Sequence, residues 1–151
     1  MKSQVKLKGI DQTLAGIRIQ IADSLNFASH YIGPRNNAYE IWRTLKPNLQ
    51  YVNDPNDAEL LQSFQTLMLN NWHGIPGAGD CDCFTIAATS CFIVSGIPCE
   101  IVLAGNTKGE PTHIYNYCKY AGSWIAFDLT EPHFAQERYY RHKQIFRIES
   151  F

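Results

Sequence analysis

The chain has 151 residues, 45% of them hydrophobic, which is typical of a folded globular domain and argues against a disordered chain. Its 13 basic and 14 acidic side chains give a formal net charge of -1, so no excess of positive charge suggests binding to nucleic acid or to a membrane surface. The size favours one domain that spans residues 1–151.

The N-terminal residues predict no targeting signal. Lysines at positions 2, 6 and 8 are not followed by an apolar core, so we expect no signal peptide. No apolar stretch approaches the roughly 20 residues of a membrane-spanning helix. Five cysteines, an odd number without a secretion signal, favour reduced thiols in the cytoplasm.

The first part of the chain predicts a short strand at residues 5–10 and then two helices. Asp11 or Thr13 could begin the first helix, which would run to about Tyr31 with one apolar face at helical spacing: Leu14, Ile17, Ile21, Leu25 and Ala28. Asn37 and Glu40 occupy the positions of a capping box for a second helix. Its apolar stripe, which Pro47 ends, is Ala38, Ile41, Trp42 and Leu45.

The stretch before the first cysteine is rich in turn residues. Residues 49–52 are apolar, and residues 53–57 form a turn cluster. Asp57 could cap a third helix that reaches Phe64 and Leu67. Residues 70–79 predict a loop, in which Trp72 and His73 would either line a cleft or serve as a loop anchor and a surface histidine.

A buried helix is predicted from Cys81 onward. Asp80 is a good N-cap residue, and Gly96 is well placed to end the helix before Pro98. The residues between them are apolar on all sides, which is typical of a helix buried at the centre of a domain. We expect the N-terminal end of this helix at the surface or in a cleft.

The position of Cys81 bears on its chemistry. The first turn of a helix favours a thiolate, whereas the neighbouring carboxylates of Asp80 and Asp82 oppose one. A reactive Cys81 would therefore need a histidine partner; the alternative is one more buried thiol. A zinc site at Cys81 and Cys83 is less favoured, because a second close pair and the usual two-residue gap are both missing.

The second half of the chain predicts strands at residues 99–103, 113–120 and 124–129. The last two would form a hairpin that turns at Ala121 and Gly122. Side chains alternate along a strand, so an even turn length places His113 and Asp128 on the same face as diagonal neighbours. The tail from residue 136 mixes a short helix with an edge strand near residues 145–148. For His113 and Asp128, the alternative is a surface histidine and an aspartate at a strand end.

These motifs, taken as a set, resemble the transglutaminase-like superfamily, which has a papain-like fold. The residues that carry the resemblance are Gly79-Asp80-Cys81-Asp82, Gly96-Ile97-Pro98, His113, residues 124–128 and Thr130. Upstream, Tyr51-Val52, Asp54-Pro55 and residues 59–63 resemble a branch common in phages and prophages. The resemblance covers about residues 38–131 and depends on the order and spacing of the whole set.

The resemblance implies a role for each matching residue. Cys81 would be the nucleophile, His113 the base and then the acid, and Asp128 the residue that orients His113. The backbone N–H of Cys81 would form part of an oxyanion hole, with Tyr51 as the candidate side-chain donor and Gln65 behind it. The sequence departs from the branch at three positions: Cys83 replaces a common aspartate, Glu100 a common arginine and Phe64 a common proline.

We therefore expect an α+β, papain-like fold with a central buried helix packed on an antiparallel sheet. The expected function is a thiol hydrolase, a cysteine peptidase or amidase, that acts on a protein or peptide through a thioester, without a metal or organic cofactor. The alternative is a phage virion or assembly protein, or a binding module, that keeps the fold without essential catalysis. The expected location is cytoplasmic or virion-associated.

Overall fold

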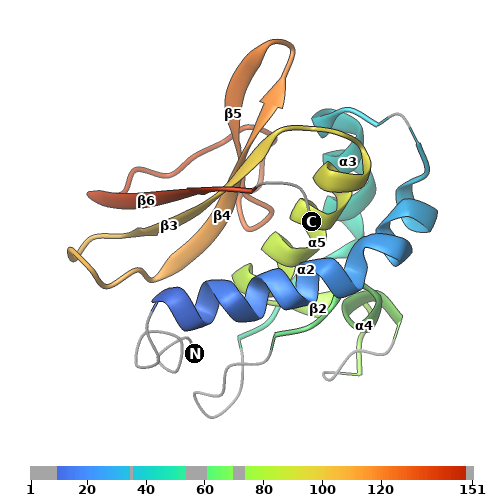
Figure 1. The fold of residues 1–151 in the computed structure, drawn as a ribbon, viewed down its shortest axis with the longest axis horizontal. Helices are drawn as coiled ribbons and strands as arrows, with labels where there is room; N and C mark the ends of the chain where they lie inside the picture. The colour runs from blue at the N-terminus through green and yellow to red at the C-terminus, as the bar shows by residue number, and fades with distance from the viewer. Residues whose placement is uncertain (1–9, 35, 54–60, 70–73, 149–151) are drawn as a thin grey trace.

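The structure is a computed structural model that describes residues 10–34, 36–53, 61–69 and 74–148. These residues form an α+β fold, with helices on one side of an antiparallel sheet (Figure 1). The described helices are α2 (Ile10–Ile32), α3 (Ala38–Leu45), α4 (Phe64–Leu69) and α5 (Cys81–Val94), with a short 3-10 turn at Lys46–Asn48. The strands are β1 (Gln50–Tyr51), β2 (Ala78–Gly79), β3 (Cys99–Gly105), β4 (His113–Tyr120), β5 (Ser123–Phe127) and β6 (His142–Arg147).

Helix α5 lies at the centre of the fold, as the sequence predicted. It packs against α2, α3 and α4 on one side and against β3 and β4 on the other (Figure 1). Every residue from Cys81 to Phe92 is buried. The Asp80 side chain caps the helix by accepting a hydrogen bond from the backbone N–H of Cys83, and Gly96, at φ 71°, follows its C-terminus.

Helix α2 begins earlier than predicted. Ile10 is its first residue, so the predicted strand at residues 5–10 is wrong at Ile10, and its other residues lie outside the described part of the chain. Ile10 packs against the same apolar cluster as Ile17 and Ile21, which extends the helical stripe by one turn. The predicted apolar face is otherwise confirmed, since Ile17, Ile21 and Ala28 are buried.

The capping box of α3 is confirmed. Asn37 Oδ1 accepts from the backbone N–H of Glu40, and Glu40 Oε1 accepts from the backbone N–H of Asn37. All four residues of the predicted stripe are buried. None of the described helices is long and apolar enough to cross a membrane.

The third helix begins later than predicted. Residues 61–63 are not helical, and α4 begins at Phe64; Asp57 lies outside the described residues. The side chain of Ser63 accepts a hydrogen bond from the backbone N–H of Thr66, and the backbone N–H of Phe64 donates to Ser24 Oγ of α2. A serine that satisfies a first-turn N–H is a usual way to begin a helix, so these contacts fix the start of α4 at Phe64.

The chain enters α5 through a short parallel pair of strands. Gln50 lies opposite Ala78, and Tyr51 lies opposite Gly79. The predicted loop at residues 70–79 is therefore wrong at its last two residues; Trp72 and His73 lie outside the described residues. This pairing brings Tyr51 close to the first turn of α5.

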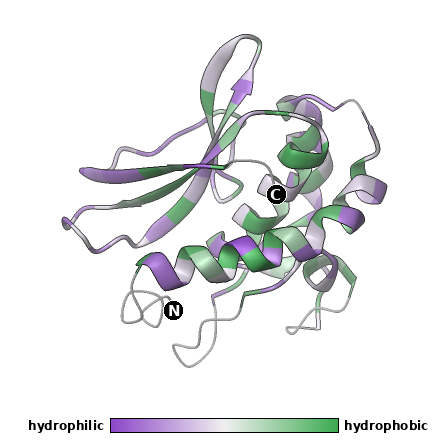
Figure 2. Cartoon of the chain, in the orientation of Figure 1, coloured by the Kyte–Doolittle hydropathy of each residue, from purple (hydrophilic) through white to green (hydrophobic). Residues whose placement is uncertain are grey.

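The large sheet has the strand order β5-β4-β3-β6, and every neighbouring pair is antiparallel. The hairpin turns at Ala121 and Gly122, both at positive φ, and pairs Tyr120 with Ser123 as predicted. Strand β6 is the predicted edge strand, although it begins three residues earlier than expected, and Figure 2 shows hydrophilic colouring over its first half. The predicted short helix after residue 136 is wrong for the described residues, which run to β6 without helical structure.

Candidate active site

The two faces of β4 have different surroundings. Ile114 and Cys118 pack into the apolar clusters that also contain residues of α5. Tyr115, on the opposite face, packs with Val102, Ala104 and Ala126 instead. His113 shares the face of Tyr115, because side chains two residues apart point the same way along a strand.

Two polar contacts fix the register between α5 and β4. The Asn116 side-chain amide donates to Thr89 Oγ1 at 2.9 Å, and Thr85 Oγ1 donates to the backbone oxygen of Ile114 at 3.3 Å. Thr85 lies one helical turn before Thr89, and Ile114 lies two residues before Asn116. One turn of α5 therefore runs beside two residues of β4. Cys81 lies one turn before Thr85, so it comes beside the start of β4, where His113 is.

His113 and Asp128 form a hydrogen-bonded pair. His113 Nε2 lies 2.7 Å from Asp128 Oδ2, which confirms the same-face arrangement predicted from the even turn length. The other carboxylate oxygen, Oδ1, accepts from the backbone N–H of Thr130 at 3.0 Å and from its hydroxyl at 2.7 Å. The carboxylate is therefore held on both oxygens. Because Asp128 engages Nε2, Nδ1 is the ring nitrogen left to exchange a proton with a thiol.

Asp128 stays ionised although it is only 2% exposed. Burial opposes ionisation, but the hydrogen bond and the charge of His113, together with the bonds from Thr130, outweigh it and lower the pKa of Asp128 below its ordinary value. An ionised acceptor strengthens its hydrogen bond to the imidazole. It also favours the tautomer that carries its proton on Nε2.

Two tyrosine rings contact the imidazole of His113. The ring of Tyr115 is stacked at 5.4 Å between centroids and 25°, and that of Tyr140 lies at 5.8 Å and 30°. The two tyrosine rings are 6.0 Å apart, so the three rings form a triangle. Tyr140 was not identified from the sequence, because it lies in the irregular segment before β6, where no periodic pattern links it to β4.

A cleft of about 490 Å³ borders His113. It is lined by Tyr51, Thr130, Arg138 and the neighbouring tyrosines of the segment before β6. The helix start was predicted at the surface or in a cleft; Cys81 is only 2% exposed, so the surface alternative is wrong. The reason is packing, since Cys81 lies in the apolar cluster formed by α2, α5 and the sheet. Cys81, Asp128 and Thr130 line one small gap between α5 and the hairpin.

Cys83 has a different environment from Cys81. It packs in the core cluster that contains Phe64 and Leu67, whereas Cys81 packs in the cluster that contains Ile17 and Ile21 of α2. Burial and the nearby charge of Asp80 raise the pKa of the Cys83 thiol to about 12, despite a hydrogen bond from Gln62. Cys83 is therefore a neutral thiol at pH 7. Burial likewise raises the pKa of each remaining thiol: Cys91, Cys99 and Cys118.

The two candidate oxyanion-hole donors lie in different places. Tyr51 lines the cleft together with His113, and its ring lies 6.0 Å from that of Phe84 in the first turn of α5. Gln65 instead donates its side-chain amide to the backbone oxygen and carboxylate of Asp23 in α2. Of the two, Tyr51 is the residue that borders the cleft.

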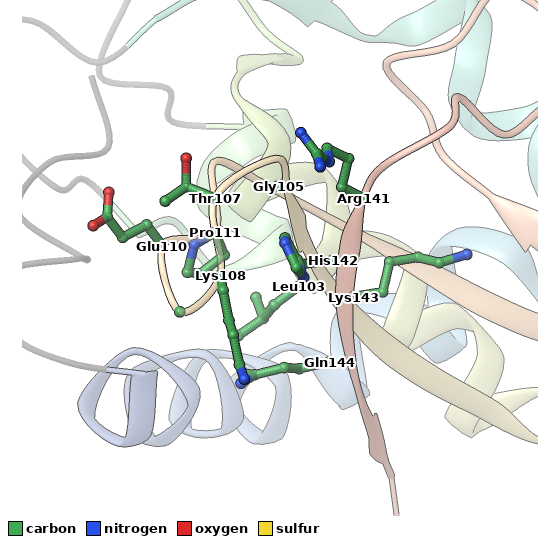
Figure 3. A pocket seen from close by; sticks show the side chains of 11 residues that line it. Leu103, Gly105, Thr107, Lys108, Glu110, Pro111, Arg141, His142, Lys143 and Gln144 are labelled. Carbon is green, nitrogen blue, oxygen red and sulfur yellow. The ribbon is translucent and has the colours of Figure 1, made fainter.

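A second cavity, of about 360 Å³, lies between the β3–β4 connection and β6 (Figure 3). His142 lines it beside Leu103, whereas the Lys143 side chain points away from it (Figure 3). It does not contain His113, Asp128 or Cys81. Within the described part of the chain, no three histidine, cysteine or acidic side chains gather as a metal site.

Solved structures of similar fold include a predicted protease from Parabacteroides distasonis, with a TM-score of 0.54 and 13% identity over 76% of this chain. A predicted cysteine protease from Cytophaga hutchinsonii overlays with a TM-score of 0.51 and 17% identity over 73% of this chain. A TGase gives a TM-score of 0.44 and 14% identity over 83% of this chain. No protein-family model and no curated protein matches the sequence.

The overlays show that the chain has the papain-like, transglutaminase-like α+β fold that its motifs predicted. They cover only 25% and 37% of the two protease chains, so this chain spans about a quarter of the one and somewhat more than a third of the other. At 13% and 17% identity, the similarity concerns the fold.

Proposed function

We propose that this protein is a thiol hydrolase, a cysteine peptidase or amidase, in which Cys81 attacks an amide carbonyl. The observation that carries the proposal is the 2.7 Å hydrogen bond between His113 Nε2 and Asp128 Oδ2, at the end of the sheet where the helix of Cys81 begins. A nucleophile, a base and a group that orients the base are what thiol catalysis requires. The fold shared with two predicted proteases supports the same reaction class by analogy.

In the first step, the Cys81 thiol transfers its proton to His113 Nδ1, and the sulfur forms a bond to the carbonyl carbon. The imidazolium then gives that proton to the departing nitrogen as the C–N bond breaks, so an amine leaves and a thioester remains. Water attacks the thioester carbonyl carbon while His113 accepts its proton, the C–S bond then breaks, and His113 returns the proton to the Cys81 sulfur. The products are a carboxylic acid and the restored thiol.

The developing oxyanion needs hydrogen-bond donors. The backbone N–H of Cys81 belongs to the first turn of α5, where the N–H groups point out of the helix end and the helix dipole is positive. The hydroxyl of Tyr51 is the proposed second donor, because Tyr51 lines the cleft beside His113. Asp128 stays ionised throughout and stabilises the imidazolium.

Limited alkylation with iodoacetamide at neutral pH, read by mass spectrometry, tests the nucleophile. We expect Cys81 to be labelled first, because the pKa of the Cys83 thiol is raised to about 12 and the other thiols are also held neutral. In His113→Ala, labelling of Cys81 should fall, since the imidazolium that favours its thiolate is gone. Equal or preferential labelling of Cys83 would contradict the assignment.

Turnover of a library of quenched fluorescent peptides tests the reaction. Cys81→Ser should abolish cleavage. Cys83→Ser is the matched control and should retain cleavage, because Cys83 packs with Phe64 and Leu67, in a different core cluster from Cys81. A chain that keeps the fold as an assembly or binding protein without essential catalysis predicts no selective labelling and no cleavage. The two experiments therefore separate the two functions.

A further inference from the structure

A hydrogen-bonded network lies on the face of the sheet that carries His113. Glu137, in the segment between β5 and β6, accepts hydrogen bonds on Oε2 from the hydroxyls of Tyr115 and Tyr117, each at 2.5 Å. Lys143 of β6 donates to the same Glu137 oxygen at 3.2 Å and to the Tyr117 hydroxyl at 2.8 Å. Three donors thus converge on one carboxylate oxygen.

Lys143 can join this network because of the alternation along β6. Figure 3 shows its side chain leaving the second cavity, while that of its neighbour His142 points into it. Lys143 therefore lies on the face of Tyr117, which its ammonium group also contacts at 5.5 Å from the ring centroid. Partial burial raises the pKa of Glu137, but the hydrogen bonds from the two tyrosines and from Lys143, together with the charge of Lys143, keep that pKa below its ordinary value.

The network reaches His113 by two routes. Tyr115, whose hydroxyl is fixed by Glu137, is stacked on the imidazole. Tyr140, three residues after Glu137 in the same irregular segment, contacts both the imidazole and the ring of Tyr115. The segment has no helix or strand of its own to hold it, so Glu137 is its main polar attachment to this face among the described contacts.

We propose that Glu137 is a positioning residue for His113. It fixes the hydroxyl of Tyr115 and holds the segment that carries Tyr140, and the two rings then restrict rotation of the imidazole and shield its bond to Asp128. Glu137 itself touches none of the reacting groups that we assign. The inference rests on the proposed role of His113, so its test includes a measurement that does not depend on turnover.

The test compares wild type, Glu137→Ala and Glu137→Gln by ¹⁵N-detected NMR of the histidine rings and by peptide turnover. In wild type, His113 should give one tautomer with a slowly exchanging Nε2 proton. In Glu137→Ala, that proton should exchange rapidly, and kcat should fall about 10- to 100-fold with KM nearly unchanged, as expected when a catalytic group loses its alignment. Glu137→Gln keeps an acceptor for both hydroxyls and should recover most of the wild-type signal and rate.

Glu100→Ala is the control. Glu100 is an acidic residue of the same sheet, paired with Arg147 at 3.9 Å and without contact to the three rings among the described contacts. It should leave the His113 signal unchanged. If Glu137→Ala does not fold, Tyr115→Phe replaces it, because this variant keeps the ring and loses only the hydroxyl.

The inference is overturned if a folded Glu137→Ala, or Tyr115→Phe in its place, keeps the wild-type Nε2 signal. The same conclusion follows if Glu137→Gln is as impaired as Glu137→Ala. A changed His113 signal in a protein that cleaves no peptide would support the positioning role and count against the proposed function instead. The two failures are therefore distinguishable.

Discussion

Thr89 of α5 accepts a hydrogen bond of 2.9 Å from the side-chain amide of Asn116 in β4, and both side chains are buried. This contact joins the helix that begins with Cys81 to the strand that begins with His113. Thr85, one turn earlier, donates to the same strand. The position of Cys81 relative to His113 is thus set by polar contacts that involve neither of these two residues.

Thr89→Val should lower the free energy of unfolding by about 1–3 kcal/mol, because the buried Asn116 amide loses an acceptor without a change in side-chain shape. Urea unfolding measures the loss. Thr44→Val is the matched control, since Thr44 donates to the backbone oxygen of Glu40 on the exposed side of α3. Its effect should stay within about 0.5 kcal/mol. An equal loss of unfolding free energy at the two positions would show that the buried hydrogen bond contributes no more to stability than the exposed one.

Asp128→Asn should leave the fold intact and lower kcat by about three to four orders of magnitude. That is the loss seen when the orienting carboxylate of a hydrolytic triad becomes an amide. The reason is that an amide neither favours the tautomer protonated on Nε2 nor stabilises the imidazolium. Steady-state kinetics and circular dichroism of the variant check both parts. A folded Asp128→Asn variant with wild-type turnover would remove Asp128 from the mechanism.

The same carboxylate should make stability depend on pH. The pKa of Asp128 is lowered in the folded state, so its contribution is fully present above the pKa of an unfolded aspartate, about 4. It is lost as the pH falls through the lower folded value. The difference in unfolding free energy between wild type and Asp128→Asn should therefore be constant near neutrality and shrink below about pH 4. A difference in unfolding free energy that increases as the pH falls would contradict a lowered pKa of Asp128.

Water rather than an amine should be the acyl acceptor, because water is always present and the cleft beside His113 is open to it. Glutamine-containing peptides, incubated with an excess of a labelled primary amine, should give mainly hydrolysis or deamidation. Mass spectrometry distinguishes the products. Dominant incorporation of the amine would assign the protein to acyl transfer.

Gly77 should tolerate substitution poorly. It has φ 83°, and a Cβ there would lie 1.9 Å from the backbone oxygen of Asn48. Gly109 has a similar φ of 76° but open space around it. Gly109→Ala should cost about 1–2 kcal/mol for the backbone conformation alone, and Gly77→Ala about 2–5 kcal/mol with the clash added. Similar losses for the two variants in urea unfolding would show that the clash is relieved cheaply.

The sequence predicted the elements that have strong local signals. The hairpin follows from alternation in β4 and β5 and from two turn residues, and it correctly placed His113 and Asp128 on one face. The capping box of α3 and the N-cap of α5 depend on neighbouring residues only. Each of these features is decided within a few residues of the chain or by the parity of a turn.

The sequence did not predict features that depend on tertiary contacts. The start of α4 is held in part by Ser24, which lies in α2. The segment around Glu137 has polar residues compatible with a helix, but two tyrosines of β4 and a lysine of β6 bind the carboxylate and hold the segment against the sheet. Burial of Cys81 results from packing by α2, which no pattern near Cys81 reveals.

The parallel pair β1–β2 gives the protein a weak point of local opening. It is held by few backbone bonds, among them Gln50 N–H to the Gly77 oxygen and Val52 N–H to the Gly79 oxygen. Its rupture would release the chain on the N-terminal side of Cys81 while the four-stranded sheet and the body of α5 stay folded. The amide protons of Gln50 and Val52 would then exchange with solvent faster than those within β4.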